Sequence, residues 1–247
     1  MDGTEIFSAK ARKYAIYRWD YAPKAIERIF EVTGIGLNST IADIGAGTGI
    51  LTRHFAGRCG RLYAVEPNSA MRAFIEPHLR TQTGCVISDG RAEKTGLPDE
   101  SIDLIAVAQA LNWFDPQRTR DEFRRILKPC GWLAAIRNVG TYGEMDAALE
   151  KVYPKETETT NFMKGKDTPA SFYMTGKEFI QGSFSFRKAE TWDEFFGSLG
   201  TASYAPDENS VLWNTFEQAA RQVFDQFSTG GQVVSEVETR LCLGKIA

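Results

Sequence analysis

Long apolar runs, a basic net charge and a secretion signal are all missing from this 247-residue sequence. No apolar stretch approaches the roughly 20 residues that a membrane-spanning helix needs, so we expect no membrane partner. Residues 1–13 lack the apolar core of a signal peptide, which predicts a cytoplasmic protein. The net charge of −3 offers no basic surface to a phosphate backbone, so nucleic acid is not an expected partner either.

Cysteine and histidine are scarce, and their spacing argues against several kinds of chemistry. The four cysteines form no C-x-x-C pair, and we interpret them as reduced thiols rather than disulfides or zinc ligands: Cys59, Cys85, Cys130 and Cys242. The two histidines, His54 and His78, fall on predicted helices, where we expect structural or surface roles. H-E-x-x-H and G-x-S-x-G are both absent, so neither metal-dependent nor acyl-transfer chemistry has support, and no metal is expected.

Strand-like and helix-like segments alternate between residues 23 and 138. Helices are expected at Pro23–Val32, at 49–56, after a cap at Asn68 or Ser69, and at Pro116–Leu127, where Asp115 is the predicted N-cap. Five short apolar segments between them are typical of buried strands: 40–45, 61–67, 84–90, 102–110 and 131–138. This alternation predicts an α/β fold with a Rossmann-like, doubly wound and mainly parallel seven-stranded sheet.

The alternation stops after Asn138. Residues 139–180 are polar, with a short predicted helix at Glu144–Val152, and we interpret them as a small helical insertion or lid. The rest of the chain predicts a strand over 179–192, a long amphipathic helix over Asn209–Phe227 and a final edge strand over 233–246. The two strands would close the sheet as a C-terminal antiparallel hairpin.

The most informative stretch is Ile41 to Ala56, "IADIGAGTGILTRHFA". Glycines at Gly45, Gly47 and Gly49 permit a tight strand-to-helix turn at the sheet edge where α/β folds bind ligands. The following helix presents free N–H groups to a polar ligand. Glu66 ends the next strand, 23 residues after Asp43 (66 − 43), where an acid can accept hydrogen bonds from ribose hydroxyls.

Two ligand classes use such a loop. The dinucleotide fingerprint G-x-G-x-x-G requires glycine at position 50, which is Ile50 here. The loop instead follows D-x-G-x-G-x-G, which resembles motif I of the class I S-adenosylmethionine-dependent methyltransferases. The glycine loop alone leaves both classes open.

Other segments extend the methyltransferase resemblance over roughly residues 5 to 138. "GRAEKTGLPDESIDLIAVAQALNWFD" and "RRILKPCGWLA" are similar to the second half of the same core. Phe7, Ser8, Ala11, Tyr14 and Arg18 follow F-S-x-x-A-x-x-Y-x-x-x-R, which resembles the branch containing trans-aconitate methyltransferase-like (methyltransferase type 11) proteins. The resemblance implies one domain over 1–247, with an N-terminal cap (1–22), a cofactor-binding core (23–138), the lid (139–180) and a C-terminal part of the core (181–247).

The resemblance also implies a cofactor, S-adenosyl-L-methionine, with S-adenosyl-L-homocysteine as product. Asp43 would support the loop, and Gly45, Ala46 and Gly47 would wrap the methionine part. Glu66 would hold the ribose. The remaining implied contacts are Pro67, Met71, Arg91 and Ala92 at the adenine, Gln109 at the methionine end, and Tyr14 and Arg18 as a cover.

Two positions depart from the family pattern. Arg91 stands where an acid often faces the adenine, which leaves the backbone of Ala92, or else Glu93 or Asp89, for that edge. Asn112 stands where many relatives have histidine, and an amide cannot act as a base near neutral pH. The catalytic candidates are therefore Asn112, Tyr17 and Arg137, and no single one is favoured; Trp113 and Phe114 are candidates for the acceptor pocket.

These observations favour a methyltransferase that acts on a small-molecule acceptor. An ionised carboxylate is one candidate acceptor, because it needs no base, and Arg137 could pair with it. A non-catalytic S-adenosylmethionine-binding protein and, less favoured, an NAD-dependent oxidoreductase stay open as alternatives. The oligomeric state is not predicted.

Overall fold

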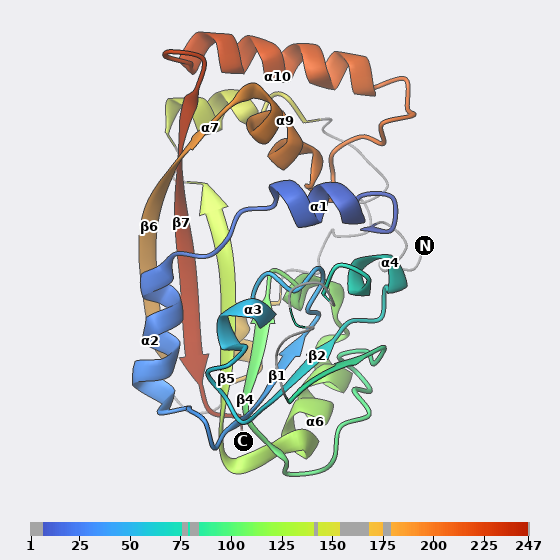
Figure 1. Cartoon of the computed structure of the whole chain (residues 1–247), viewed down its shortest axis with the longest axis vertical. Helices are drawn as coiled ribbons and strands as arrows, with labels where there is room; N and C mark the ends of the chain where they lie inside the picture. Colours follow the sequence, from blue (N-terminus) through green and yellow to red (C-terminus); the bar gives the residue numbers. More distant parts are fainter. Residues whose placement is uncertain are drawn as a thin grey trace.

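The computed structural model describes residues 7–75, 79, 84–140, 143–153, 168–174 and 179–246. His78 and much of the predicted lid, 154–167 and 175–178, lie outside these residues. In the described part of the chain, seven strands form one sheet with the order β3-β2-β1-β4-β5-β7-β6 (Figure 1). The strands are β1 (Thr40–Ile44), β2 (Arg61–Val65), β3 (Cys85–Ser88), β4 (Ile102–Ala108), β5 (Leu127–Gly140), β6 (Ile180–Glu190) and β7 (Val233–Gly244).

The strands up to β5 pair in parallel, and β7 pairs antiparallel with both β5 and β6. The predicted α/β fold with a mainly parallel seven-stranded sheet and a C-terminal antiparallel hairpin is therefore confirmed. The expectation that the last strand is an edge strand is wrong. β7 lies between β5 and β6, and eight of its twelve residues are buried. The alternation that suggested an edge arises because one face of β7 is polar.

Helices cover both faces of the sheet (Figure 1). α2 (Pro23–Thr33) starts with proline in its first turn, ends at Gly34 with φ +66°, and packs Ala25, Ile26 and Ile29 against β1, β4, β5 and β7. α6 (Pro116–Ile126) packs on the opposite face through Phe123 and Ile126, with Asp115 as its N-cap. The shorter elements on the core are α1 (Ala11–Tyr17), α3 (Thr52–Phe55), α4 (Ser69–Arg72), η2 (Leu111–Trp113) and η3 (Ala170–Phe172).

Three helices form a separate layer above the carboxyl end of β5 (Figure 1). They are α7 (Glu144–Leu149), α9 (Trp192–Gly200) and α10 (Trp213–Phe227), and they share one hydrophobic cluster centred on Phe195, Phe216 and Phe224. We call this layer the helical cap. α9 was not expected from the sequence, although the capping box of Thr191 and Glu194 marks its start. α10 starts four residues later than expected, and α3 spans only four residues of the predicted 49–56 helix.

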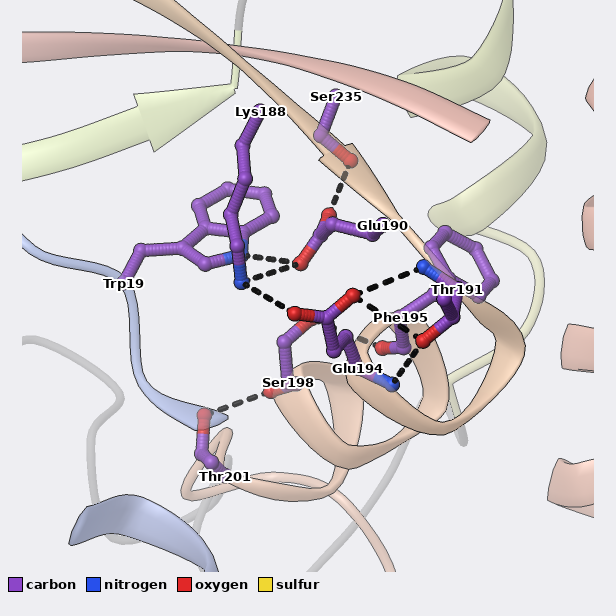
Figure 2. Close-up of polar contacts among 9 residues, drawn as sticks. All are labelled: Trp19, Lys188, Glu190, Thr191, Glu194, Phe195, Ser198, Thr201 and Ser235. Carbon is purple, nitrogen blue, oxygen red and sulfur yellow. Dashed lines mark hydrogen bonds and ion pairs between the residues drawn. The ribbon is translucent and has the colours of Figure 1, made fainter. Parts of the chain in front are cut away.

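A buried carboxylate joins the cap to the rest of the molecule (Figure 2). Glu190, fully buried at the end of β6, accepts hydrogen bonds from the Trp19 indole at 2.7 Å and from the Ser235 hydroxyl at 2.5 Å. Lys188 lies 3.4 Å from the same carboxylate. One side chain thus connects the segment after α1, β7 and the start of α9. No helix in the described ranges has the length and apolarity to cross a bilayer.

Candidate functional site

The glycine loop lies where the sequence places it, between β1 and α3. Gly45, Gly47 and Gly49 all have positive φ, at +72°, +58° and +84°. A Cβ on Gly45 would lie 2.8 Å from the Cβ of Ala110, which follows β4. Glycine is therefore required at position 45 by both backbone conformation and close approach.

Asp43 of β1 connects the two ends of this loop through Thr52, the first residue of α3. The Asp43 side chain is completely buried, and its Oδ2 accepts a hydrogen bond from the Thr52 hydroxyl at 2.6 Å. Its Oδ1 has no hydrogen-bond donor among the described residues. Burial raises the pKa of the Asp43 carboxyl to about 7.

Glu66 connects the end of β2 to the glycine loop. Its Oε2 accepts the Gly47 N–H at 2.8 Å, and its Oε1 accepts the Asn68 N–H at 2.9 Å. Burial raises the pKa of Glu66, while these two backbone hydrogen bonds oppose the shift. Each carboxylate oxygen has a second lone pair, so the group can still accept hydrogen bonds from a ligand.

A cavity opens beside Glu66, and we call it the glycine-loop cavity. Most of the predicted cofactor and pocket residues line it: Tyr14, Gly45, Gly47, Glu66, Pro67, Met71, Arg91, Ala92, Gln109, Trp113 and Phe114. Ala46 lies in the loop but does not line the cavity, and Asp43, Tyr17, Arg18, Asn112 and Arg137 lie elsewhere. Glu93, an alternative for the adenine edge, also lines it, and Phe7, Asn68, Ala108 and Ala110 line it without having been singled out as contacts.

Aromatic side chains narrow this cavity. Its volume is about 130 Å³, below the roughly 300–1,000 Å³ typical of small-molecule pockets. Phe7 packs edge-to-face on Trp113, with ring centroids 5.1 Å apart, and on Tyr14, at 6.1 Å. A nucleoside-sized ligand therefore requires these rings to move or has to extend past Gln109.

Gln109 lines the glycine-loop cavity and also the two further cavities described below. It has a φ of +57°, which is unusual for a residue other than glycine. When the side-chain amide of Gln109 is oriented with its oxygen toward the neighbouring donors, that oxygen accepts hydrogen bonds from the Asn138 N–H at 3.1 Å and from an Arg18 guanidinium nitrogen at 3.2 Å. Strained backbone of this kind is concentrated at functional sites.

Residues 18–22, which we call the strap, run past the end of β5 and over β7. Asn138 donates to the Asp20 carbonyl at 2.9 Å, and the Ala22 N–H donates to the Thr239 hydroxyl at 2.9 Å. Arg18 donates to the Thr201 hydroxyl at 3.2 Å and lies over the Tyr14 ring. The Asp20 carboxylate meets His54 and Arg53 of α3, each at 2.7 Å. Burial raises the pKa of Asp20, but hydrogen bonds from His54 and Arg53 outweigh it and hold the pKa below its usual value. The strap thus connects the glycine-loop side to the helical cap.

Two further cavities lie beyond Gln109. The strap cavity, about 300 Å³, lies between the strap, the end of β5 and the cap. The β5–β7 cavity, about 890 Å³, lies on the α6 face of the sheet and is lined by parts of β4, η2, β5, β6, β7 and residues 168–171. Asn112 and Arg137 line the β5–β7 cavity. Tyr17 packs against α9 instead, where a Cβ on Gly197 would lie 2.5 Å from its ring.

The fold and the site together define a Rossmann-like α/β domain with a ligand cavity beside its glycine loop. Residues 42–135 match the family model described as a methyltransferase domain. Residues 42–135 are therefore similar to a methyltransferase domain, and membership of the chain in the class I S-adenosylmethionine-dependent methyltransferase family stays a prediction. Membership in the trans-aconitate-like branch stays a prediction.

Named relatives agree with this family. An uncharacterized methyltransferase of Mycobacterium tuberculosis is 34% identical over 132 residues, which cover 53% of this chain and 51% of the relative. One from Schizosaccharomyces pombe is 33% identical over 134 residues, covering 54% and 52%. The chain thus spans about half the length of these curated relatives. A solved structure, a putative type II methyltransferase from Anaeromyxobacter dehalogenans, shares the fold with a TM-score of 0.66, 22% identity, and coverage of 93% of this chain and 98% of that chain.

Proposed function

We propose that this protein binds S-adenosylmethionine in the glycine-loop cavity and transfers its methyl group to a small-molecule acceptor. The observation that carries the proposal is the Glu66 carboxylate, which is fixed by the Gly47 and Asn68 N–H groups and lines the cavity. A fixed acid with spare lone pairs suits a ribose diol. A methyltransferase of the same fold, geranyl diphosphate C-methyltransferase from Streptomyces coelicolor A3(2), was solved with S-adenosyl-L-homocysteine (TM-score 0.50, 14% identity, 90% of this chain and 75% of that chain).

The described residues fit such a ligand. Glu66 would hold the ribose. Pro67, Met71, Arg91 and Ala92 would flank the adenine, and Gly45, Ala46, Gly47 and Gln109 would hold the methionine end. Tyr14 would cover the ligand, with Arg18 behind its ring, outside the cavity. When bound, the cofactor would supply a methyl group activated by its attachment to a cationic sulfur, together with a neutral thioether as leaving group. The chain's own contribution is alignment and exclusion of water by the strap, Phe7 and Trp113.

The cavities favour an acceptor that needs no general base. No histidine lines any of the three cavities in the part of the chain that the structure describes. Where many relatives have histidine, this chain has the Asn112 amide, which cannot take up a proton. A carboxylate acceptor is already ionised at neutral pH, so positioning alone would suffice. We accordingly propose a carboxylate as acceptor and a cytoplasmic site of action, with no nucleic acid or membrane partner.

Calorimetric titration of S-adenosylmethionine and S-adenosylhomocysteine tests the cofactor, with NAD as the competing ligand. Glu66→Gln should weaken binding of both sulfur compounds at least tenfold, because the amide has one oxygen in place of two, and its NH₂ group would face either the Gly47 or the Asn68 N–H and offer the diol no acceptor there. Glu31→Gln, which removes an exposed acid on α2, is the matched control and should bind as the wild type does. Folded protein that binds neither sulfur compound would overturn the proposal, and binding of NAD alone would favour the oxidoreductase alternative.

A further inference from the structure

The β5–β7 cavity adjoins the glycine-loop cavity directly. Gln109 and Ala110 line both, so a molecule in the larger space can reach the methionine end of a ligand in the smaller one. Its size, about 890 Å³, falls within the range of small-molecule sites. Hydrogen-bonding side chains line it on several sides, including Asn112, Ser171 and Gln181.

Two arginines lie next to each other on this face of the sheet. Arg137 of β5 and Arg240 of β7 are register partners, and both line the cavity. Arg240 is neutralised, because its Nε lies 2.6 Å from Glu238 Oε1. The exposed Arg137 makes no hydrogen bond or ion pair with any residue that the structure describes. The cavity therefore carries one uncompensated positive charge.

The strap cavity has a different charge. Its guanidinium, Arg18, already meets Thr201, Gln109 and the Tyr14 ring. Two acids of the α7 region, Asp146 and Glu150, also line it. An anion entering there would meet both carboxylates, whereas an anion entering the β5–β7 cavity would meet the Arg137 guanidinium, which has no partner among the residues that the structure describes.

We propose that the β5–β7 cavity is the acceptor site and that Arg137 binds an oxyanion of the acceptor. This inference rests on the proposed function, because it assigns the acceptor side of the same transfer. The guanidinium presents paired N–H donors whose geometry matches both carboxylate and phosphate. An acceptor with either group is selected over its neutral analogue because only the anion satisfies Arg137.

Binding to protein saturated with S-adenosylhomocysteine tests the site, with benzoate, phenyl phosphate and benzamide as probes and ligand-observed NMR as the readout. The two anions should bind at least tenfold more tightly than benzamide, and their relative affinity distinguishes a carboxylate site from a phosphate site. Arg137→Gln should lower the affinity for the anions to that for benzamide. Ser183→Trp, which fills the cavity from the exposed strand β6, should abolish binding of all three probes.

Matched controls lie on the same strand outside the cavity. Arg187→Gln removes an exposed arginine and Ser185→Trp adds the same ring two residues away, and both should leave every probe affinity within twofold. All four variants should bind S-adenosylhomocysteine as the wild type does, which reports on the proposed function separately. Equal binding of anions and benzamide, no binding of the anions, or unchanged affinities in Arg137→Gln would overturn the acceptor assignment while leaving the cofactor assignment standing.

Discussion

Asp43→Asn should remove a pH dependence of stability that the wild-type protein carries. Burial raises the pKa of the Asp43 carboxyl from 3.8 to about 7. The difference is about 3 units (7 − 3.8), and at 1.36 kcal/mol per unit the ionised form costs the folded state about 4 kcal/mol. Because the folded pKa is raised, this carboxyl stabilises the protein fully below about pH 4, and that contribution is lost as the pH rises through about 7.

The asparagine of this variant can still accept from the Thr52 hydroxyl, but it cannot ionise. The free energy of unfolding of Asp43→Asn relative to the wild type should therefore rise by about 2.5 kcal/mol between about pH 5 and pH 8. Urea denaturation at intervals of about half a pH unit measures this difference. Asp121→Asn, an exposed change on α6, should give a constant difference. A constant difference for Asp43→Asn as well would contradict this prediction, because it would mean that Asp43 titrates alike in the folded and unfolded chain.

Two further predictions concern how the helical cap is attached. Thr191 is the N-cap of α9 and makes a reciprocal capping box with Glu194. Thr191→Ala should therefore lower the free energy of unfolding by about 1 kcal/mol, measured by urea denaturation. An unchanged denaturation midpoint would show that this capping box does not stabilise the protein. The two oxygens of the buried Glu190 carboxylate accept hydrogen bonds from Trp19 and Ser235. The amide of Glu190→Gln has only one oxygen and can accept only one of them, so the free energy of unfolding should fall by about 1–3 kcal/mol. Glu236→Gln on neighbouring β7 is its control, and equal stability of these two glutamate variants would contradict an anchoring role for Glu190.

The parallel core could be predicted from the sequence because its signals are local. Proline in the first turn of α2 and α6, caps at Asn68 and Asp115, and short apolar runs between them each depend on neighbouring residues only. The glycine loop and Glu66 followed for the same reason, since both belong to one strand–helix–strand unit. Local signals do not reveal which strand a distant strand pairs with, and that is why β7 was wrongly expected at the edge.

The helical cap shows a different limit. α7 and the pair α9 and α10 are separated by more than forty residues, yet they share one hydrophobic cluster. Each helix alone looks like an ordinary amphipathic segment, so a partition of the chain by sequence composition divides them between a lid and a core. The strap was equally hidden, because Arg18, Trp19 and Asp20 each contact a different distant segment.

The position of β7 connects the fold to the choice of acceptor. Because β7 inserts between β5 and β6, it places Arg240 opposite Arg137 and supplies Glu238 to neutralise only Arg240. Had β7 been the edge strand, β6 would have paired with β5, and the charge on this face would have come from different residues. The cofactor side of the molecule depends on one local loop, whereas the charge on the proposed acceptor side depends on strand order. This difference explains how a chain can resemble methyltransferases over its core while the charge of its proposed acceptor site depends on residues more than one hundred positions apart in the sequence, Arg137 and Arg240.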